Sequence, residues 1–200
     1  MNFLAHLYLS ESNTNIIIGN FIADHIRGNK FTHLDPEIQE GIFLHRQIDT
    51  FTDAHEIVRQ SKRRLNPQYG HYGGIIIDIF YDHFLAKNWD TYSAIPLDVY
   101  VQSVYKLLED NNAILPKKTI ELLPYMIEYD WLYNYQFLDG MKNVLIGMNR
   151  RTRGKSKMDL AIEDLQLLYT EFEHDFTLFF VDLQKFASNR LIQINKIIKE

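Results

Sequence analysis

The sequence predicts an all-α fold, organised as one compact domain over residues 1–200. Its 200 residues include only five prolines and nine glycines, which favours long helices joined by short connections. Apolar residues recur at helical spacing along most of the chain, and no segment shows the alternation of a half-buried strand. Hydrophobic residues make up 46% and charged residues 24%, as in soluble globular proteins. We therefore expect a multi-helix bundle in which residues 1–90 carry the informative motifs and residues 91–200 complete the helical core.

Capping and breaking residues place the individual helices. Asn13 or Thr14 caps the first helix and Gly28 stops it, and Asp35 with Pro36 opens the second. The isoleucines at 75–77 alone would fit a buried strand, but the apolar segment around them is longer than a typical strand. The expected helices cover about 14–27, 36–64, 72–87, 98–111, a fifth from 116 with a kink at Pro124, 133–148, and 158–199 as one helix or two in series.

The charge and the cysteine count exclude several classes of function. Lys and Arg number 21 and Asp and Glu 26, and the formal net charge of −5 argues against nucleic-acid binding driven by overall charge. The absence of cysteine excludes disulfides, thiolate metal sites and cysteine nucleophiles. No apolar run reaches the roughly 18–20 residues that span a bilayer, and the N-terminus lacks the features of a signal peptide. We expect a cytoplasmic protein without a nucleic-acid or membrane partner.

Polar pairs with a spacing of four residues stand inside apolar helix faces. His45 and Asp49 lie within the apolar stripe of the second helix, and Asp78 and Asp82 lie on a third helix that is apolar nearly all round. Two buried carboxylates cost several kcal/mol each unless they are paired or bound to a metal. Carboxylates with imidazole suit Mg²⁺, Mn²⁺ or Fe²⁺. The pattern therefore predicts a divalent metal centre.

The same spacing occurs twice more near the N-terminus, at Asn2 with His6 and at Asn20 with Asp24. If these helix faces converge, the interior holds His6, Asp24, His45, Asp49, Asp78 and Asp82. The other interpretation is a set of satisfied polar core groups, and for His6 alone that is the more common outcome. A salt-bridge network would need basic residues in the core, and the nearest in sequence lie on other faces. Asp53, at the edge of the stripe, either supports the site or is solvated.

Two basic clusters stand out against the acidic net charge. Arg59, Lys62, Arg63 and Arg64 end the second helix, where the helix dipole favours cations. A second cluster follows in a probable loop at Arg150, Arg151, Arg153, Lys155 and Lys157. Each cluster is either solvated or a docking site for an acidic partner or a phosphate.

Several motifs occur in a fixed order along the chain: MNFLAHL at 1–7, GNFIAD at 19–24, LHRQID at 44–49 with FTD at 51–53, DIFYDHFL at 78–85, DWL at 130–132 with Tyr135, and MNRR at 148–151. Together they resemble the acyl carrier protein phosphodiesterases over most of the chain. The resemblance implies a helical bundle that diverged from the HD-domain metal phosphohydrolases and uses Mn²⁺ or a similar ion, with Mg²⁺ or Fe²⁺ as alternatives. It implies removal of 4′-phosphopantetheine from holo-acyl carrier protein to give the apo protein. His25 departs from the family pattern, where an apolar residue is expected.

These inferences define the expected site. The expected metal ligands are Asp24, His45, Asp49, Asp78 and Asp82, with His6, Asn20, His25 and His83 around them. His83 or His45 would protonate the leaving serine oxygen, and Asp53 is a further catalytic candidate. Carrier proteins are acidic, so Arg59, Lys62, Arg63, Arg64, Arg150 and Arg151 are candidates for steering the encounter. The alternatives are an HD-type phosphohydrolase acting on a small phosphoester or nucleotide, and a helical binding protein without catalytic activity.

Overall fold

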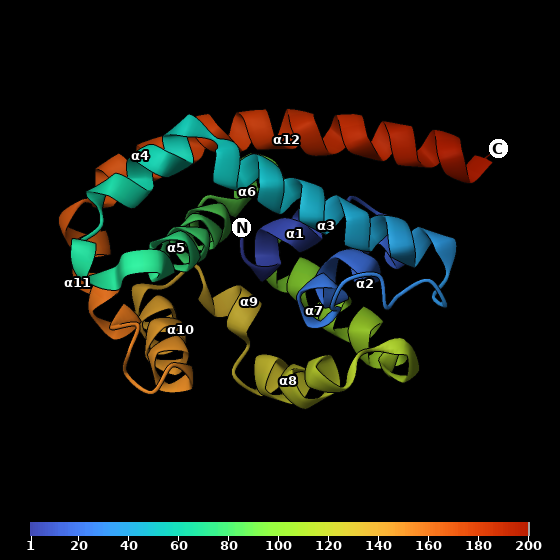
Figure 1. Ribbon diagram of the computed structural model, residues 1–200, viewed down its shortest axis with the longest axis horizontal. Helices are drawn as coiled ribbons and strands as arrows, with labels where there is room; N and C mark the ends of the chain where they lie inside the picture. Colours follow the sequence, from blue (N-terminus) through green and yellow to red (C-terminus); the bar gives the residue numbers. More distant parts are fainter. Residues whose placement is uncertain (200) are drawn as a thin grey trace.

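A computed structural model describes the backbone of residues 1–199 and the side chains of residues 1–196. Within that range the chain consists of α-helices and short 3₁₀ turns without a strand, which confirms the all-α prediction (Figure 1). The elements are α1 (Phe3–Tyr8), α2 (Thr14–Ile22), η1 (Ala23–His25), α3 (Pro36–Ala54), α4 (Glu56–Arg64), η2 (Pro67–Tyr72), α5 (Gly73–Lys87), α6 (Trp89–Tyr92), α7 (Leu97–Asp110), η3 (Asn112–Ile114), α8 (Lys117–Glu128), α9 (Trp131–Asn134), α10 (Leu138–Arg151), η4 (Met158–Leu160), α11 (Ala161–Leu167) and α12 (Tyr169–Lys199).

The predicted caps of the first two long helices are confirmed. The Asn13 side chain accepts hydrogen bonds from the backbone amides of Asn15 and Ile16 at the start of α2, at 3.0 and 3.2 Å. Asp35 accepts from the amide of Glu37, and Pro36 occupies the first turn of α3. These bonds satisfy amides that have no partner inside the helix.

Three helix boundaries differ from the prediction. The helix expected to reach residue 27 ends at Ile22, and a 3₁₀ turn then carries Asp24 and His25. The helix expected over 36–64 is two helices, because His55 is extended (φ −72°, ψ 134°) between α3 and α4. This break allows both helices to follow α12, against which each of them packs (Figure 1). The segment expected over 133–148 is likewise divided, into α9 and α10, whereas the two helices in series allowed over 158–199 are confirmed as α11 and α12.

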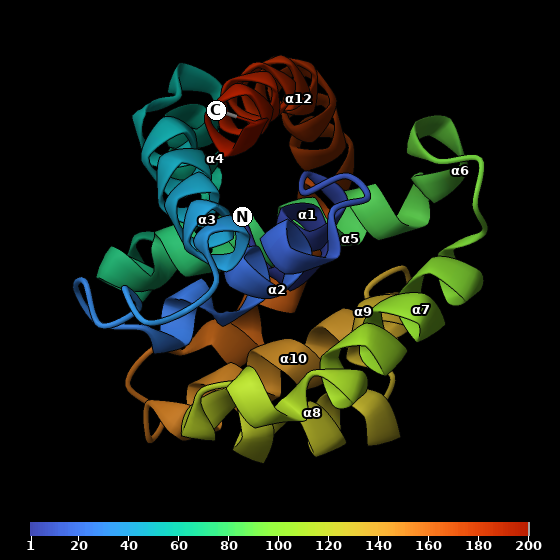
Figure 2. The same ribbon diagram turned by 90° about the vertical axis from the view of Figure 1, so that its right-hand side faces the viewer.

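The helices form three levels, and the site lies where α3 meets the middle level. In Figure 2, α12 lies with α3 and α4 at one side, α1, α2 and α5 lie in the middle, and α7 to α10 form the other side. One hydrophobic core connects these levels, and it includes the phenylalanines of α12 at 172, 176, 179 and 180, which are completely buried. In the part of the chain that the structure describes, every helix falls short of the length and apolarity needed to cross a bilayer.

Close contact between α2 and α3 depends on two glycines. A Cβ atom at Gly19 would lie 2.0 Å from the carbonyl oxygen of Ile38, and one at Gly41 would lie 2.4 Å from that of Ile16. Any side chain at either position would therefore push the two helices apart. Asn20 follows Gly19 directly, and His45 lies one turn beyond Gly41, so this crossing brings their side chains together.

Candidate functional site

The site is built around the imidazole of His45, which Asn20 orients. Nδ1 of His45 lies 2.9 Å from the backbone carbonyl oxygen of Asn20 and 3.1 Å from its side-chain oxygen. A carbonyl oxygen can only accept, so Nδ1 carries the hydrogen and donates it. The side-chain amide nitrogen of Asn20 donates in turn to the backbone carbonyl oxygen of His6 and to Ser10 Oγ. In the neutral ring, Nε2 then carries the free electron pair. This Nδ1–H tautomer is the one found in histidines that bind a metal through Nε2.

Nε2 of His45 faces two carboxylates. It lies 3.1 Å from Asp49 Oδ2 and 3.3 Å from Asp24 Oδ1. His45 is buried, whereas the side chains of Asp49 and Asp24 are 43% and 60% exposed. The group therefore stands at the boundary between the core and solvent, where a ligand can reach it.

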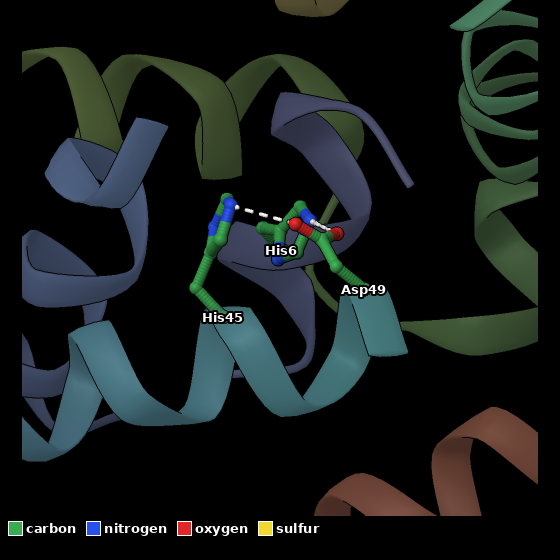
Figure 3. A group of neighbouring side chains, drawn as sticks. All are labelled: His6, His45 and Asp49. Carbon is green, nitrogen blue, oxygen red and sulfur yellow. Dashed lines mark hydrogen bonds and ion pairs between the residues drawn. The ribbon is translucent and has the colours of Figure 1, made fainter. Parts of the chain in front are cut away.

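His6 completes a group of side chains in the described part of the chain that could hold a metal ion. One ligand atom each from His6, His45 and Asp49 all lie within 4.8 Å of one another (Figure 3). Nε2 of His6 lies 3.1 Å from Asp49 Oδ1, and the two imidazole rings stack at a centroid distance of 3.9 Å. The sequence analysis expected His6 around the ligands rather than among them. The sequence signal for His6 was its four-residue spacing from Asn2.

The electrostatics of this group leave one histidine charged. Burial alone would lower the pKa of His45, but its hydrogen bonds to Asp24 and Asp49 outweigh burial and raise that pKa to about 9. Burial, together with the charge on His45, lowers the pKa of His6 to about 4. The hydrogen bond from His45 holds the pKa of Asp24 below its usual value. His45 is thus the cation that neutralises part of the negative charge of Asp24 and Asp49.

Asp78 lies beside this group and is half-buried. Its Oδ1 is 3.0 Å from the α-amino nitrogen of Met1, which is also 3.8 Å from Asp49 Oδ1. This ammonium group is buried among the carboxylates and offsets their charge. Asp78 therefore stands next to Asp49 across a shared cation.

Asp82 and His83 make other contacts than those expected of a ligand and a proton donor. Asp82 is completely buried, and its two oxygens accept hydrogen bonds from the backbone amides of Leu4 and Ala5, at 2.7 and 3.2 Å. Asp82, on α5, thereby caps the first turn of α1, although the two helices are far apart in the sequence. Burial raises the pKa of Asp82 to about 7. Both ring nitrogens of His83 are also engaged, one by the Tyr135 carbonyl oxygen and the other by the Tyr169 hydroxyl, each at 2.7 Å.

Two further candidates lie at the edge of the site. The Asp53 side chain is 76% exposed and forms an ion pair with Lys62 Nζ at 2.9 Å. His25 is held by a 2.7 Å hydrogen bond between its Nδ1 and Thr119 Oγ1 on α8. Burial lowers the pKa of His25. Asp53 and His25 both border the cleft described next.

A cleft of about 1470 Å³ opens over these groups. Asp24, Asp49, Asp53 and Asp78 line its acidic end, and residues of α8, α9, α10 and their connecting segments form most of the opposite wall. Much of this second wall is apolar or aromatic, and sequence analysis missed it because aromatic residues here look like ordinary core residues. Its members are Leu122, Tyr125, Tyr129, Trp131, Tyr135, Phe137, Val144, Ile146 and Met148.

The two basic clusters differ in their relation to the cleft. Arg150 and Arg151, at the end of α10, line it. The α4 cluster does not border it: Arg64 forms an ion pair with the buried carboxylate of Asp175 at 2.9 Å, and Lys62 is paired with Asp53. Arg59 and Arg63 are exposed elsewhere on α4. The geometry thus favours Arg150 and Arg151 over the α4 cluster as ligand-binding residues.

Comparisons with known proteins identify the family of this chain. A family model described as acyl carrier protein phosphodiesterase matches residues 1–183. An acyl carrier protein phosphodiesterase of Photorhabdus laumondii is 32% identical over 194 residues, which cover 95% of this chain and 96% of the relative. One from Klebsiella pneumoniae is 34% identical over 196 residues, covering 95% and 99%. One from Salmonella agona is 34% identical over 194 residues, covering 96% and 100%.

No solved structure matches the chain, so the likeness to HD-domain phosphohydrolases stays a prediction. The match of the family model covers α1 to α5, which carry the histidine and aspartate group, and α8 to α10, which form the opposite wall of the cleft. The relatives are matched over nearly their whole length. The chain belongs to the acyl carrier protein phosphodiesterase family.

Proposed function

We propose that this protein hydrolyses the phosphodiester bond between 4′-phosphopantetheine and the serine of holo-acyl carrier protein, releasing the apo protein, and that it uses a divalent metal ion. The observation that carries the proposal is the placement of Asp24 and Asp49, which contact His45, in one cleft with Arg150 and Arg151. Family membership supplies the substrate class. The expected cytoplasmic location stays a prediction.

The residues present fit a divalent metal ion. The donors are imidazole nitrogens and carboxylate oxygens, which suit Mn²⁺, Mg²⁺ or Fe²⁺. His45 is held by Asn20 with its Nε2 turned toward Asp24 and Asp49, and Nδ1 of His6 is buried without a hydrogen-bond partner among the described residues. We assign His45, Asp49 and Asp24 as ligands, with His6 as a fourth and Asp78 next to them. Asp82 is outside this set because α1 amides occupy both of its oxygens.

When bound, such an ion lowers the pKa of a water molecule toward neutrality and neutralises charge on the phosphodiester oxygens. To serve as a ligand, Nε2 of His45 would have to lose its proton, and a bound ion would then supply the positive charge that offsets Asp24 and Asp49. Asn20 keeps the ring in the required orientation in both states.

The opposite side of the cleft binds the substrate in this proposal. The guanidinium groups of Arg150 and Arg151 form charge-assisted hydrogen bonds with the phosphate or with acidic side chains of the carrier protein. The apolar wall formed by α8, α9 and α10 contacts the pantetheine arm and excludes water from it. The phosphodiester then lies between this wall and the carboxylates of Asp24 and Asp49.

The intact mass of the carrier protein tests the substrate assignment. The purified protein is stripped of metal with EDTA, supplied with Mn²⁺, Mg²⁺ or Fe²⁺, and incubated with holo-acyl carrier protein, whose intact mass is then measured. We expect loss of the phosphopantetheine mass from the carrier. Hydrolysis of bis(p-nitrophenyl) phosphate with an unchanged carrier would instead identify an enzyme for small phosphoesters. Neither activity, with no metal bound, would identify a binding protein.

A further inference from the structure

Two consecutive residues of α5 hold two different segments that contribute residues to the cleft, without bordering the cleft themselves. Side chains of neighbouring helical residues point about 100° apart. Asp82 accordingly holds the first turn of α1 through the amides of Leu4 and Ala5. His83 holds the segment after α9 through the carbonyl oxygen of Tyr135. The buried helix α5 therefore fixes both the element that carries His6 and the element that carries the aromatic wall.

The hydrogen bonds of His83 use both of its nitrogens. The Tyr135 carbonyl oxygen can only accept, so Nδ1 of His83 carries the hydrogen and donates it at 2.7 Å. Nε2 then accepts from the hydroxyl of Tyr169, also at 2.7 Å. The residue is 1% exposed and does not border the cleft. In this arrangement neither nitrogen faces a substrate.

Tyr135 connects His83 to the residues that line the cleft. Its hydroxyl accepts a hydrogen bond from Asn2 Nδ2 at 3.0 Å, and Asn2, Trp131 and Tyr135 all line the cleft. Tyr135 is 1% exposed, so its backbone and ring are both enclosed. A continuous series of hydrogen bonds thus runs from Tyr169 on α12 through His83 and Tyr135 to Asn2.

We propose that His83 is a positioning residue, which holds the Trp131–Tyr135 segment against the N-terminal segment and so shapes the substrate-binding wall, rather than a proton donor. The proposal rests on the proposed function for its kinetic consequence. Removing the ring would release the Tyr135 carbonyl oxygen and loosen the wall that contacts the pantetheine arm. The metal-binding group, on α1, η1 and α3, keeps its own contacts. We therefore expect removal of the His83 ring to lower kcat/KM mainly by raising KM, and to leave the metal affinity unchanged.

The test compares His83→Gln with His83→Ala. A glutamine amide offers an N–H donor and a carbonyl acceptor, so it can rebuild both hydrogen bonds, but it cannot serve as a proton donor in the reaction. We expect His83→Ala to lower kcat/KM for holo-acyl carrier protein about tenfold, mainly through KM, as for the loss of a buried hydrogen bond. We expect His83→Gln to stay within about twofold of wild type.

Two controls separate positioning from general loss of stability. Ser61→Ala removes a buried hydrogen bond to Asp175 and another to Tyr81, away from the cleft, and should lower the melting temperature without raising KM. Hydrogen exchange followed by mass spectrometry should show faster exchange over residues 129–137 in His83→Ala and wild-type exchange in His83→Gln. A His83→Gln protein as inactive as His83→Ala, with this segment still protected, would overturn the proposal and assign proton transfer to His83. Wild-type KM and wild-type exchange in His83→Ala would overturn it as well.

The exchange measurement does not depend on activity. If the wild-type protein leaves holo-acyl carrier protein intact, the proposed function fails, and faster exchange of 129–137 in His83→Ala alone still supports the positioning role. If the wild-type protein is active and exchange is the same in all variants, the positioning role fails and the proposed function stands.

Discussion

The imidazole rings of His6 and His45 stack at a centroid distance of 3.9 Å with an interplanar angle of 17°, and both face Asp49. Two stacked imidazoles at this distance cannot both be protonated without strong repulsion. The pKa values separate accordingly, to about 4 for His6 and about 9 for His45. Without a metal ion, the site therefore depends on one proton at His45.

This proton makes the metal-free protein sensitive to alkaline pH. The pKa of His45 is raised from 6.5 to about 9 on folding. The contribution of its proton to the free energy of unfolding is therefore fully present below about pH 6.5 and is lost as the pH rises through about 9. The shift corresponds to about 3 kcal/mol of unfolding free energy, as an order of magnitude. We expect urea unfolding in EDTA to show this loss in the wild-type protein and a flatter profile in His45→Gln. Equal profiles would contradict the charged state assigned to His45.

Metal affinity is expected to depend on pH in the opposite direction. Mn²⁺ competes with the proton on Nε2 of His45, so its apparent affinity should rise about tenfold per pH unit between pH 6 and 8. Isothermal titration calorimetry at several pH values measures this slope. Asp49→Asn should abolish binding, whereas Asp53→Asn, a matched change at an exposed carboxylate, should leave it within about twofold. A pH-independent affinity would argue against His45 as a ligand.

The α2–α3 crossing should be intolerant of even a methyl group. Gly41→Ala places a Cβ atom against the carbonyl oxygen of Ile16, and the helices must move apart to accommodate it. We expect a loss of about 2–4 kcal/mol in unfolding free energy, together with weaker metal binding because the contact between Asn20 and His45 opens. Gly147→Ala, at a helical glycine with open space around it, is the control and should be neutral or slightly stabilising. Unchanged stability in Gly41→Ala would contradict the close approach.

Charge reversal distinguishes the two basic clusters. Arg150→Glu with Arg151→Glu should lower kcat/KM for holo-acyl carrier protein at least about tenfold at low salt, with a smaller effect at high salt. Arg59→Glu with Arg63→Glu is a matched change on exposed residues outside the cleft and should cost less than about threefold. A larger loss from the α4 pair would place the carrier protein on the other basic surface.

The sequence predicted the helical class and the pairing of His45 with Asp49, because capping and i,i+4 spacing are local properties. It expected Asp24 beside them only if the helix faces converge, and the packing of α3 against α2 and η1 brings this about. It did not predict the roles of Asp82 and His83, because their partners are distant: Leu4 is 78 residues from Asp82, and Tyr135 is 52 residues from His83. Burial of a carboxylate indicates that it needs partners, and here the partners are amides of another helix. The break at His55 was also missed, because packing of α3 and α4 against α12 decides it rather than a local breaker.

The most direct test of the account is the intact mass of holo-acyl carrier protein after incubation with the EDTA-treated protein, with and without Mn²⁺, beside the Asp49→Ala variant. We predict that the wild-type protein removes the phosphopantetheine mass only when Mn²⁺ is added, and that Asp49→Ala does not remove it under either condition. Removal by Asp49→Ala at the wild-type rate, or full activity of the wild-type protein in EDTA, would contradict the account.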